Sequence, residues 1–154
     1  MKLSELLDEA NIIPDLKAKD KKEVLEELAE SITGLAPSLD KGSLVKVLLE
    51  RERLGSTGIG DGIAIPHGKF QGINSPIVSF GRSLRGLNFE SMDGQPAFLF
   101  FLLVAPENSA SIHLKALAKI SKILKNSSIR KVLMEAPTRK ALFQIIIQND
   151  KNFL

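Results

Sequence analysis

Residues 55–69 of the chain read Gly55-Ser56-Thr57-Gly58-Ile59-Gly60-Asp61-Gly62-Ile63-Ala64-Ile65-Pro66-His67-Gly68-Lys69. Glycine stands at four of the first eight positions, which excludes an interior helix or strand and indicates a loop with close backbone approach or positive φ. The following Ile-Ala-Ile carries a strand signal and leads directly into Pro66 and His67. Since Pro66 fixes the direction of the chain and Gly68 leaves the ring uncrowded, the stretch predicts an exposed imidazole where a short strand ends. A loop histidine with ordinary surface duties is the alternative.

The glycine spacing excludes the two common nucleotide-binding templates. Gly58, Gly60 and Gly62 alternate, whereas a dinucleotide fingerprint requires G-x-G-x-x-G. The segment from Gly62 to Lys69 lacks the spacing of a Walker loop and the Ser or Thr that follows its lysine. The chemistry of this stretch therefore depends on His67.

The rest of the sequence predicts helices before and after an apolar strand. Residues 97–104 are apolar throughout, which is typical of a strand covered on both faces. The periodicity and the helix stop signals predict helices at 21–32, 40–54, 111–124, 128–135 and 138–148, a short helix at 3–7, an extended piece at 11–14 and a further strand at 77–84. This order predicts one α/β domain over residues 1–154, with a central sheet sandwiched between helical layers.

Composition removes several classes of chemistry. The chain has 154 residues, no cysteine and two histidines, His67 and His113. The lack of cysteine excludes disulfide scaffolds, cysteine-ligated zinc, iron–sulfur clusters and thiol nucleophiles. The N-terminal sequence carries acids where a signal peptide needs an apolar core, and no apolar run approaches the roughly 20 residues of a spanning helix, so a cytoplasmic location is expected.

Charge is divided unevenly along the chain. Residues 1–50 hold 7 lysines and 11 acids, a net of −4, and residues 51–154 hold 14 basic residues and 7 acids, a net of +7. Solvated helix faces explain such a division most simply. The predicted final helices carry one acidic residue, Glu135, against a set of basic residues that we call the basic face: Lys115, Lys119, Lys122, Lys125, Arg130, Lys131, Arg139 and Lys140. This excess of positive charge suggests an acidic partner for the basic face.

Two further residues accompany His67 as candidates. His113 lies on the apolar stripe of its predicted helix, where a satisfied core histidine is the more common explanation. Arg51 continues an apolar stripe at the end of helix 40–54, where its stem would pack while the guanidinium reaches water. The residue types also fit a phosphoryl group, with His67 as acceptor and His113 or Arg51 stabilising its charge.

The stretch from Arg51 to Lys69 resembles the active-site segment of the enzyme IIA proteins of the phosphotransferase system (PTS), fructose/mannitol/nitrogen-regulatory type. The resemblance extends to Asp93-Gly94-Gln95-Pro96 and His113-Leu114, covers nearly the whole chain, and is closest to the nitrogen-regulatory members. It implies a mixed central sheet between helical layers and no metal or cofactor. It also implies that His67 accepts a phosphoryl group from the carrier HPr or its nitrogen-branch paralogue, with Arg51 and His113 in the site. Supporting positions would be Ser56, Thr57, Asp61 and Gly68.

Several functions remain open from the sequence. A nitrogen-regulatory protein would regulate a target protein, whereas a fructose-type IIA subunit would pass the phosphoryl group to a IIB domain. A pure binding module would use phosphorylation only as a switch, because an added phosphate brings up to about two negative charges. A metal hydrolase using His67, His113 and Asp61 fits poorly, since two histidines this far apart match no compact ligand motif. Nucleic-acid binding also fits poorly, because aromatic residues are 5% and no reader motif is present.

Overall fold

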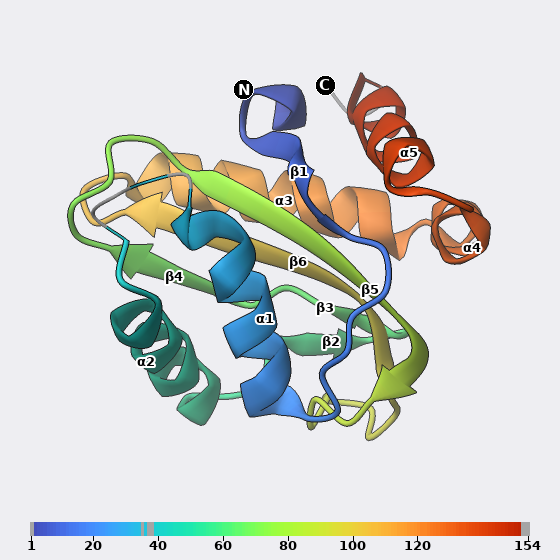
Figure 1. Cartoon of the computed structure of the whole chain (residues 1–154), viewed down its shortest axis with the longest axis horizontal. Helices are drawn as coiled ribbons and strands as arrows, with labels where there is room; N and C mark the ends of the chain where they lie inside the picture. Colours follow the sequence, from blue (N-terminus) through green and yellow to red (C-terminus); the bar gives the residue numbers. More distant parts are fainter. Residues whose placement is uncertain (1, 35, 37–38, 152–154) are drawn as a thin grey trace.

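A mixed β-sheet forms the centre of the protein (Figure 1). In the computed structural model, which describes residues 2–34, 36 and 39–151, the strands are β1 (Leu7–Ile13), β2 (Gly58–Gly60), β3 (Ile63–Ala64), β4 (His67–Phe70), β5 (Ile77–Leu87) and β6 (Ala97–Pro106). Their order is β1-β5-β6-β3-β2, and β4 also pairs with β6. β6 runs antiparallel to β5 but parallel to β3 and β4. The predicted α/β class and the mixed sheet are therefore confirmed.

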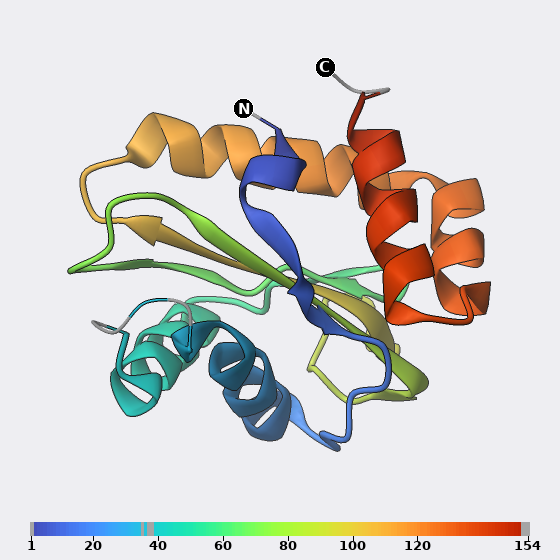
Figure 2. The same cartoon turned by 45° about the horizontal axis from the view of Figure 1, so that its top comes forward.

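Helices cover the sheet on both faces (Figure 2). They are a 3-10 helix η1 (Leu3–Glu5) and the α-helices α1 (Lys21–Thr33), α2 (Lys41–Arg53), α3 (Ala110–Lys125), α4 (Ser127–Glu135) and α5 (Arg139–Lys151). α1 and α2 lie on one face, and α3 to α5 lie on the other. Side chains cap four of the helices at their N-termini, which fixes where each begins: Asp20 for α1, Asp40 for α2, Asn126 for α4 and Thr138 for α5.

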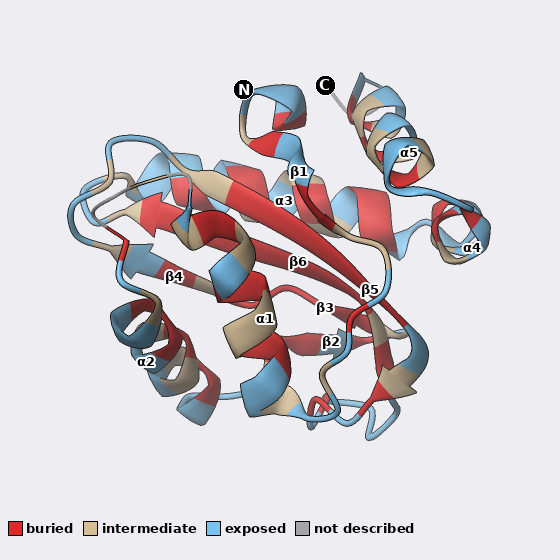
Figure 3. Cartoon of the chain, viewed as in Figure 1, coloured by how far each residue is buried: buried red, intermediate tan, exposed pale blue. Residues whose placement is uncertain are grey.

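Strand β6 is apolar and buried along most of its length (Figure 3). Both of its faces therefore need a covering layer of helices. Leu99, Phe101 and Leu103 pack in the core under α3, α4 and α5. The alternate residues Phe100, Leu102 and Val104 pack in a second core under α1 and α2. Because neighbouring side chains of a strand point to opposite faces, a strand buried on both sides is apolar at every position. The prediction of a strand covered on both faces is confirmed.

Three local expectations were wrong. The helix expected at 3–7 ends at Glu5, and Leu7 instead begins β1, which pairs in parallel with β5. The glycine-rich stretch, expected to contain no strand, holds the short edge strand β2, where an added Cβ on Gly58 would collide with the Ser91 hydroxyl oxygen. His67 does not end a strand in a loop but begins β4. In β2, Gly58 leaves room for the side chain of Ser91. Composition alone does not distinguish this use of glycine in a strand from its use in a loop.

Within the described residues, no helix is long and apolar enough to cross a membrane.

Candidate active site

His67 is positioned by the first hydrogen bonds of β4. The strand runs parallel to β6 with His67 opposite Leu103, whose backbone N–H donates to the Pro66 carbonyl at 3.0 Å. The His67 Nδ1 atom lies 2.8 Å from the carbonyl oxygen of Ile65. A carbonyl can only accept a hydrogen bond, so Nδ1 carries the proton and Nε2 carries the free lone pair. The ring is half-buried rather than exposed as the sequence suggested, and the His113 ring of α3 lies against it.

His113 lies beside His67 although 46 positions separate them. The two rings meet edge to face, with 5.3 Å between their centroids and 65° between their planes. The topology explains the contact, since α3 begins just after β6 ends, and β6 is the strand that pairs with β4. His113 is buried, and its Nδ1 has no hydrogen-bond partner among the described residues. Such a buried nitrogen is costly unless something else binds there.

Arg51 reaches the same place from the last turn of α2. Its Nη1 donates to the Gly55 carbonyl at 2.9 Å, which holds the guanidinium against the turn that follows the helix. The close approach of α2 to β4 depends on Gly68, where an added Cβ would lie 3.0 Å from Val47 Cγ1. Gly68 therefore serves helix packing as well as leaving the imidazole uncrowded.

These groups line one pocket with a volume of about 640 Å³. It lies between α2, β4 and α3, and its lining residues are Val47, Glu50, Arg51, Leu54, His67, Gly68, Lys69, His113, Leu114 and Leu117. Lys69 was assigned no role from the sequence, but it stands two residues after His67 on β4, so the two side chains share a face. Two cations and two imidazoles around one hollow fit an anion such as a phosphoryl group.

The surroundings lower the pKa of both imidazoles below the ordinary value. For His67, burial lowers the pKa most and nearby Arg51 lowers it further, against opposing effects from the Ile65 carbonyl and Glu52. For His113, burial again dominates, and His67 and Lys69 also lower the pKa. Both rings are therefore neutral at neutral pH, and the lone pair on His67 Nε2 is available to attack phosphorus.

This shift predicts how reactivity depends on pH. An NMR titration of His67 is expected to give a midpoint below the ordinary value of 6.5, and phosphoryl acceptance should persist below pH 6.5. The sign for stability follows, because an unfolded chain whose imidazole pKa is higher binds more protons, so stability falls as pH drops from 6.5 through the folded pKa. A His67 midpoint at or above 6.5 would contradict the expected shift.

The remaining expected site residues lie outside this pocket. Ser56 donates to the Phe89 carbonyl at 3.2 Å, and the hydroxyl of Thr57 donates to the buried carboxylate of Glu52. Asp61 lines a different hollow, together with Arg130 and Lys131. Asp61 precedes β3, and β3 begins to pair with β6 four residues before the position at which His67 pairs with β6. Four residues of a strand span about 13 Å. The structure therefore brings together His67, Arg51, His113 and Gly68, but not Ser56, Thr57 or Asp61.

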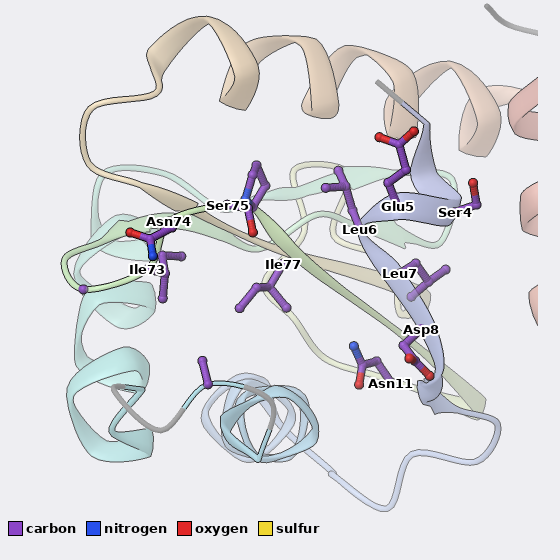
Figure 4. Close-up of a pocket in the computed structure, with 13 residues that line it drawn as sticks. Ser4, Glu5, Leu6, Leu7, Asp8, Asn11, Ile73, Asn74, Ser75 and Ile77 are labelled. Carbon is purple, nitrogen blue, oxygen red and sulfur yellow. The ribbon is translucent and has the colours of Figure 1, made fainter.

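Another hollow, of about 520 Å³, lies between the start of β1 and the segment before β5 (Figure 4). Its lining includes Glu5 and Asp8 but no histidine, lysine or arginine. With no cation in this lining to offset its carboxylates, the hollow would repel an anion and does not compete as a phosphoryl site. Across the described residues, no three histidine, aspartate or glutamate side chains gather where a metal ion would bind.

The helix-covered mixed sheet corresponds to that of a known class of phosphotransfer proteins. Over residues 5–149 the chain matches the family described as "Phosphoenolpyruvate-dependent sugar phosphotransferase system, EIIA 2", and it belongs to that family.

The relatives reported next are named either as nitrogen regulatory proteins or as a fructose-specific PTS component. A nitrogen regulatory protein of Bradyrhizobium diazoefficiens is 40% identical over 146 residues, covering 95% of both chains. The PTS fructose-specific EIIABC component of Bacillus subtilis is 40% identical over 151 residues, 98% of this chain but 24% of that protein's length. The crystal structure of nitrogen regulatory protein IIA-Ntr from Neisseria meningitidis superimposes with a TM-score of 0.88 at 33% identity, covering 94% of this chain and 98% of the other.

Proposed function

We propose that the protein is a phosphohistidine carrier in which His67 Nε2 accepts a phosphoryl group from the phosphohistidine of HPr or its nitrogen-branch paralogue. The observation that carries this proposal is the 2.8 Å contact between His67 Nδ1 and the Ile65 carbonyl. It leaves Nε2 unprotonated without a separate general base. Family membership supports a phosphotransfer role in general, and the residue assignment rests on this geometry.

The transfer requires positioning and charge stabilisation more than covalent help from other groups. The lone pair of Nε2 forms the new P–N bond while the P–N bond of the donor breaks, and that electron pair stays on the donor imidazole. Each ring keeps its own N–H, so no proton has to be moved. Arg51 and Lys69 would offset the charge on the phosphoryl oxygens, and an N–H of His113 would donate to one of them.

We propose that the carrier acts mainly as a regulator of another protein. The rim of the pocket carries two large apolar side chains in water, Leu54 at 84% exposed and Leu114 at 66%. Such residues around a modifiable histidine suit a protein partner whose apolar contact would be broken by the charge of a phosphate. The similarity to nitrogen regulatory proteins over nearly their whole length supports this role.

A sugar-transport subunit is the second candidate, and the similarity to a fructose-specific EIIABC component supports it. In that role the phosphoryl group would move from His67 to a IIB domain.

The basic face on α3 to α5 would be available to an acidic partner in either role. There, Lys115, Lys122, Lys125, Lys131, Arg139 and Lys140 are exposed, whereas Lys119 pairs with Asp150 and Arg130 binds backbone carbonyls at the end of α3.

Stepwise labelling tests the proposal. The protein is incubated with labelled phosphoenolpyruvate, enzyme I and HPr, and a IIB domain is added afterwards. We expect an acid-labile, alkali-stable label that needs all three upstream components and stays on the protein when IIB is added. A label that passes to IIB would establish the sugar-transport role instead. Absence of any label with either HPr or its nitrogen-branch paralogue would refute the carrier proposal.

A further inference from the structure

The side chain of Glu52 is a buried carboxylate that connects the end of α2 with the 55–57 turn and with the start of α1. Glu52 is the penultimate residue of α2 and is 7% exposed. Its carboxylate accepts hydrogen bonds from the Thr57 backbone N–H at 3.1 Å and from the Thr57 hydroxyl. Lys21 Nζ, from the first residue of α1, lies 3.1 Å from Glu52 Oε1. Three donors therefore converge on one carboxylate, which satisfies a charge that would otherwise be costly to bury.

The contacts continue from Glu52 to the imidazole of His67. The Thr57 carbonyl accepts a hydrogen bond from the Ile65 N–H at 3.0 Å. The carbonyl of the same Ile65 then holds His67 Nδ1 at 2.8 Å. The position of the residue that selects the His67 tautomer thus depends on Thr57, and Thr57 is held at two atoms by Glu52.

Glu52 also borders the segment that holds Arg51. The Gly55 N–H donates to the Glu52 carbonyl at 3.1 Å, and the Gly55 carbonyl accepts from Arg51 Nη1 at 2.9 Å. The side chain of Glu52 closes this turn by binding Thr57 across it. A shift of the turn would therefore move the guanidinium and the Ile65 carbonyl together.

We propose that Glu52 is a positioning residue for phosphoryl transfer, acting through Thr57 and Ile65 to fix the tautomer of His67 and through the 55–57 turn to fix Arg51. This rests on the proposed carrier function but adds a residue that touches neither phosphoryl group nor donor. Lys21 completes the device by neutralising the buried carboxylate, and it is held in turn by Glu90 at 3.2 Å and by the Phe89 ring at 4.9 Å.

Glu52→Gln tests the proposal with little change in shape. An amide offers one acceptor oxygen and adds two N–H donors, so it cannot accept from Thr57 and Lys21 as the carboxylate does. We expect the rate of phosphoryl acceptance at saturating donor to fall about tenfold or more, since small misplacements of reacting groups have effects of this size. The KM for the donor should stay within about twofold, because the docking surface is unchanged.

A spectroscopic measurement separates positioning from general loss of stability. The ¹⁵N resonances of the His67 ring report which nitrogen carries the proton. We expect wild type to show one dominant Nδ1–H tautomer and Glu52→Gln to show a mixture of tautomers. Removing the charge of Glu52 also removes an influence that raises the pKa of His67, so the titration midpoint should move to lower pH. The other titratable or charged groups at the pocket are unchanged in this variant: Glu50, Arg51, Lys69 and His113.

Matched variants complete the experiment. Thr57→Ser keeps the hydroxyl donor and should behave as wild type, whereas Thr57→Val should reproduce the effect of Glu52→Gln and replaces it if that variant fails to fold. Glu30→Gln breaks an exposed ion pair with Lys41 between the same two helices and should change nothing. An unchanged tautomer in Glu52→Gln or Thr57→Val would overturn the positioning role, whatever happens to the rate. If wild type accepts no phosphoryl group, the carrier function fails, but the tautomer measurement still decides the role of Glu52.

Discussion

Replacing His67 with alanine is expected to abolish phosphoryl acceptance. The substitution removes the imidazole whose lone pair is directed by a backbone contact, the Ile65 carbonyl at 2.8 Å from Nδ1. The neighbouring His113 does not substitute for it, because its Nδ1 is buried without a partner among the described residues and its tautomer is not fixed. Labelling with enzyme I, HPr and phosphoenolpyruvate should therefore give no acid-labile label on His67→Ala.

Two further variants serve as comparisons. Arg51→Ala should still be labelled, but about a hundredfold or more slowly, since one lost donor to a developing charge commonly has this effect. His113→Ala should also be labelled more slowly while remaining folded. Full labelling of His67→Ala would show that another residue is the acceptor, and an unchanged rate in Arg51→Ala would remove Arg51 from the site.

Replacing Arg82 with methionine is expected to destabilise the fold by about 3 kcal/mol or more. This arginine of β5 is 5% exposed, and its guanidinium binds backbone carbonyls rather than a carboxylate. Nε donates to Pro14 at 3.0 Å, while Nη1 donates to Leu133 at 2.8 Å and Ala136 at 2.7 Å. Methionine fills a similar volume but leaves these carbonyls without a donor, and each unsatisfied buried group costs about 1–3 kcal/mol.

Denaturant unfolding measures this effect against a matched control. Arg85 lies on the same strand but is exposed, so Arg85→Met should change stability by no more than about 0.5 kcal/mol. Equal unfolding midpoints for Arg82→Met and Arg85→Met would contradict the structural role of Arg82. Because Arg82 does not line the His67 pocket, the folded fraction of Arg82→Met should still accept a phosphoryl group.

The central strand and its helical layers could be predicted from sequence because each has a local signal. Uniform apolarity in β6 indicates burial on both faces, and Asp20 and Asp40 mark the starts of α1 and α2 as N-caps. β1 has no comparable signal, because its sequence, Leu-Asp-Glu-Ala-Asn-Ile-Ile, buries residues without regular alternation. Its pairing shifts register between Leu7 and Ile12, so contact with β5 rather than local preference makes it a strand.

The candidate site was predictable only in part. His67 and Arg51 belong to one recognisable motif, whereas the contact between His67 and His113 depends on which strands pair with β6. Lys69 could have been placed beside His67 by the two-residue period of a strand, had a second strand been expected after Pro66 in addition to the one before it. Glu52 gave no sequence signal, because a charged residue near a helix end is usually exposed. Its burial depends on three donors brought together from α1 and the 55–57 turn.

The most direct test of the carrier proposal is to locate the phosphoryl group on the labelled protein by ¹H–¹⁵N and ³¹P NMR. The hydrogen bond from Nδ1 to the Ile65 carbonyl leaves Nε2 of His67 as the nucleophile, so the phosphoryl group should be found on that atom, with Nδ1 still protonated. A phosphoryl group on His67 Nδ1, on His113 or on any other residue would contradict this mechanism.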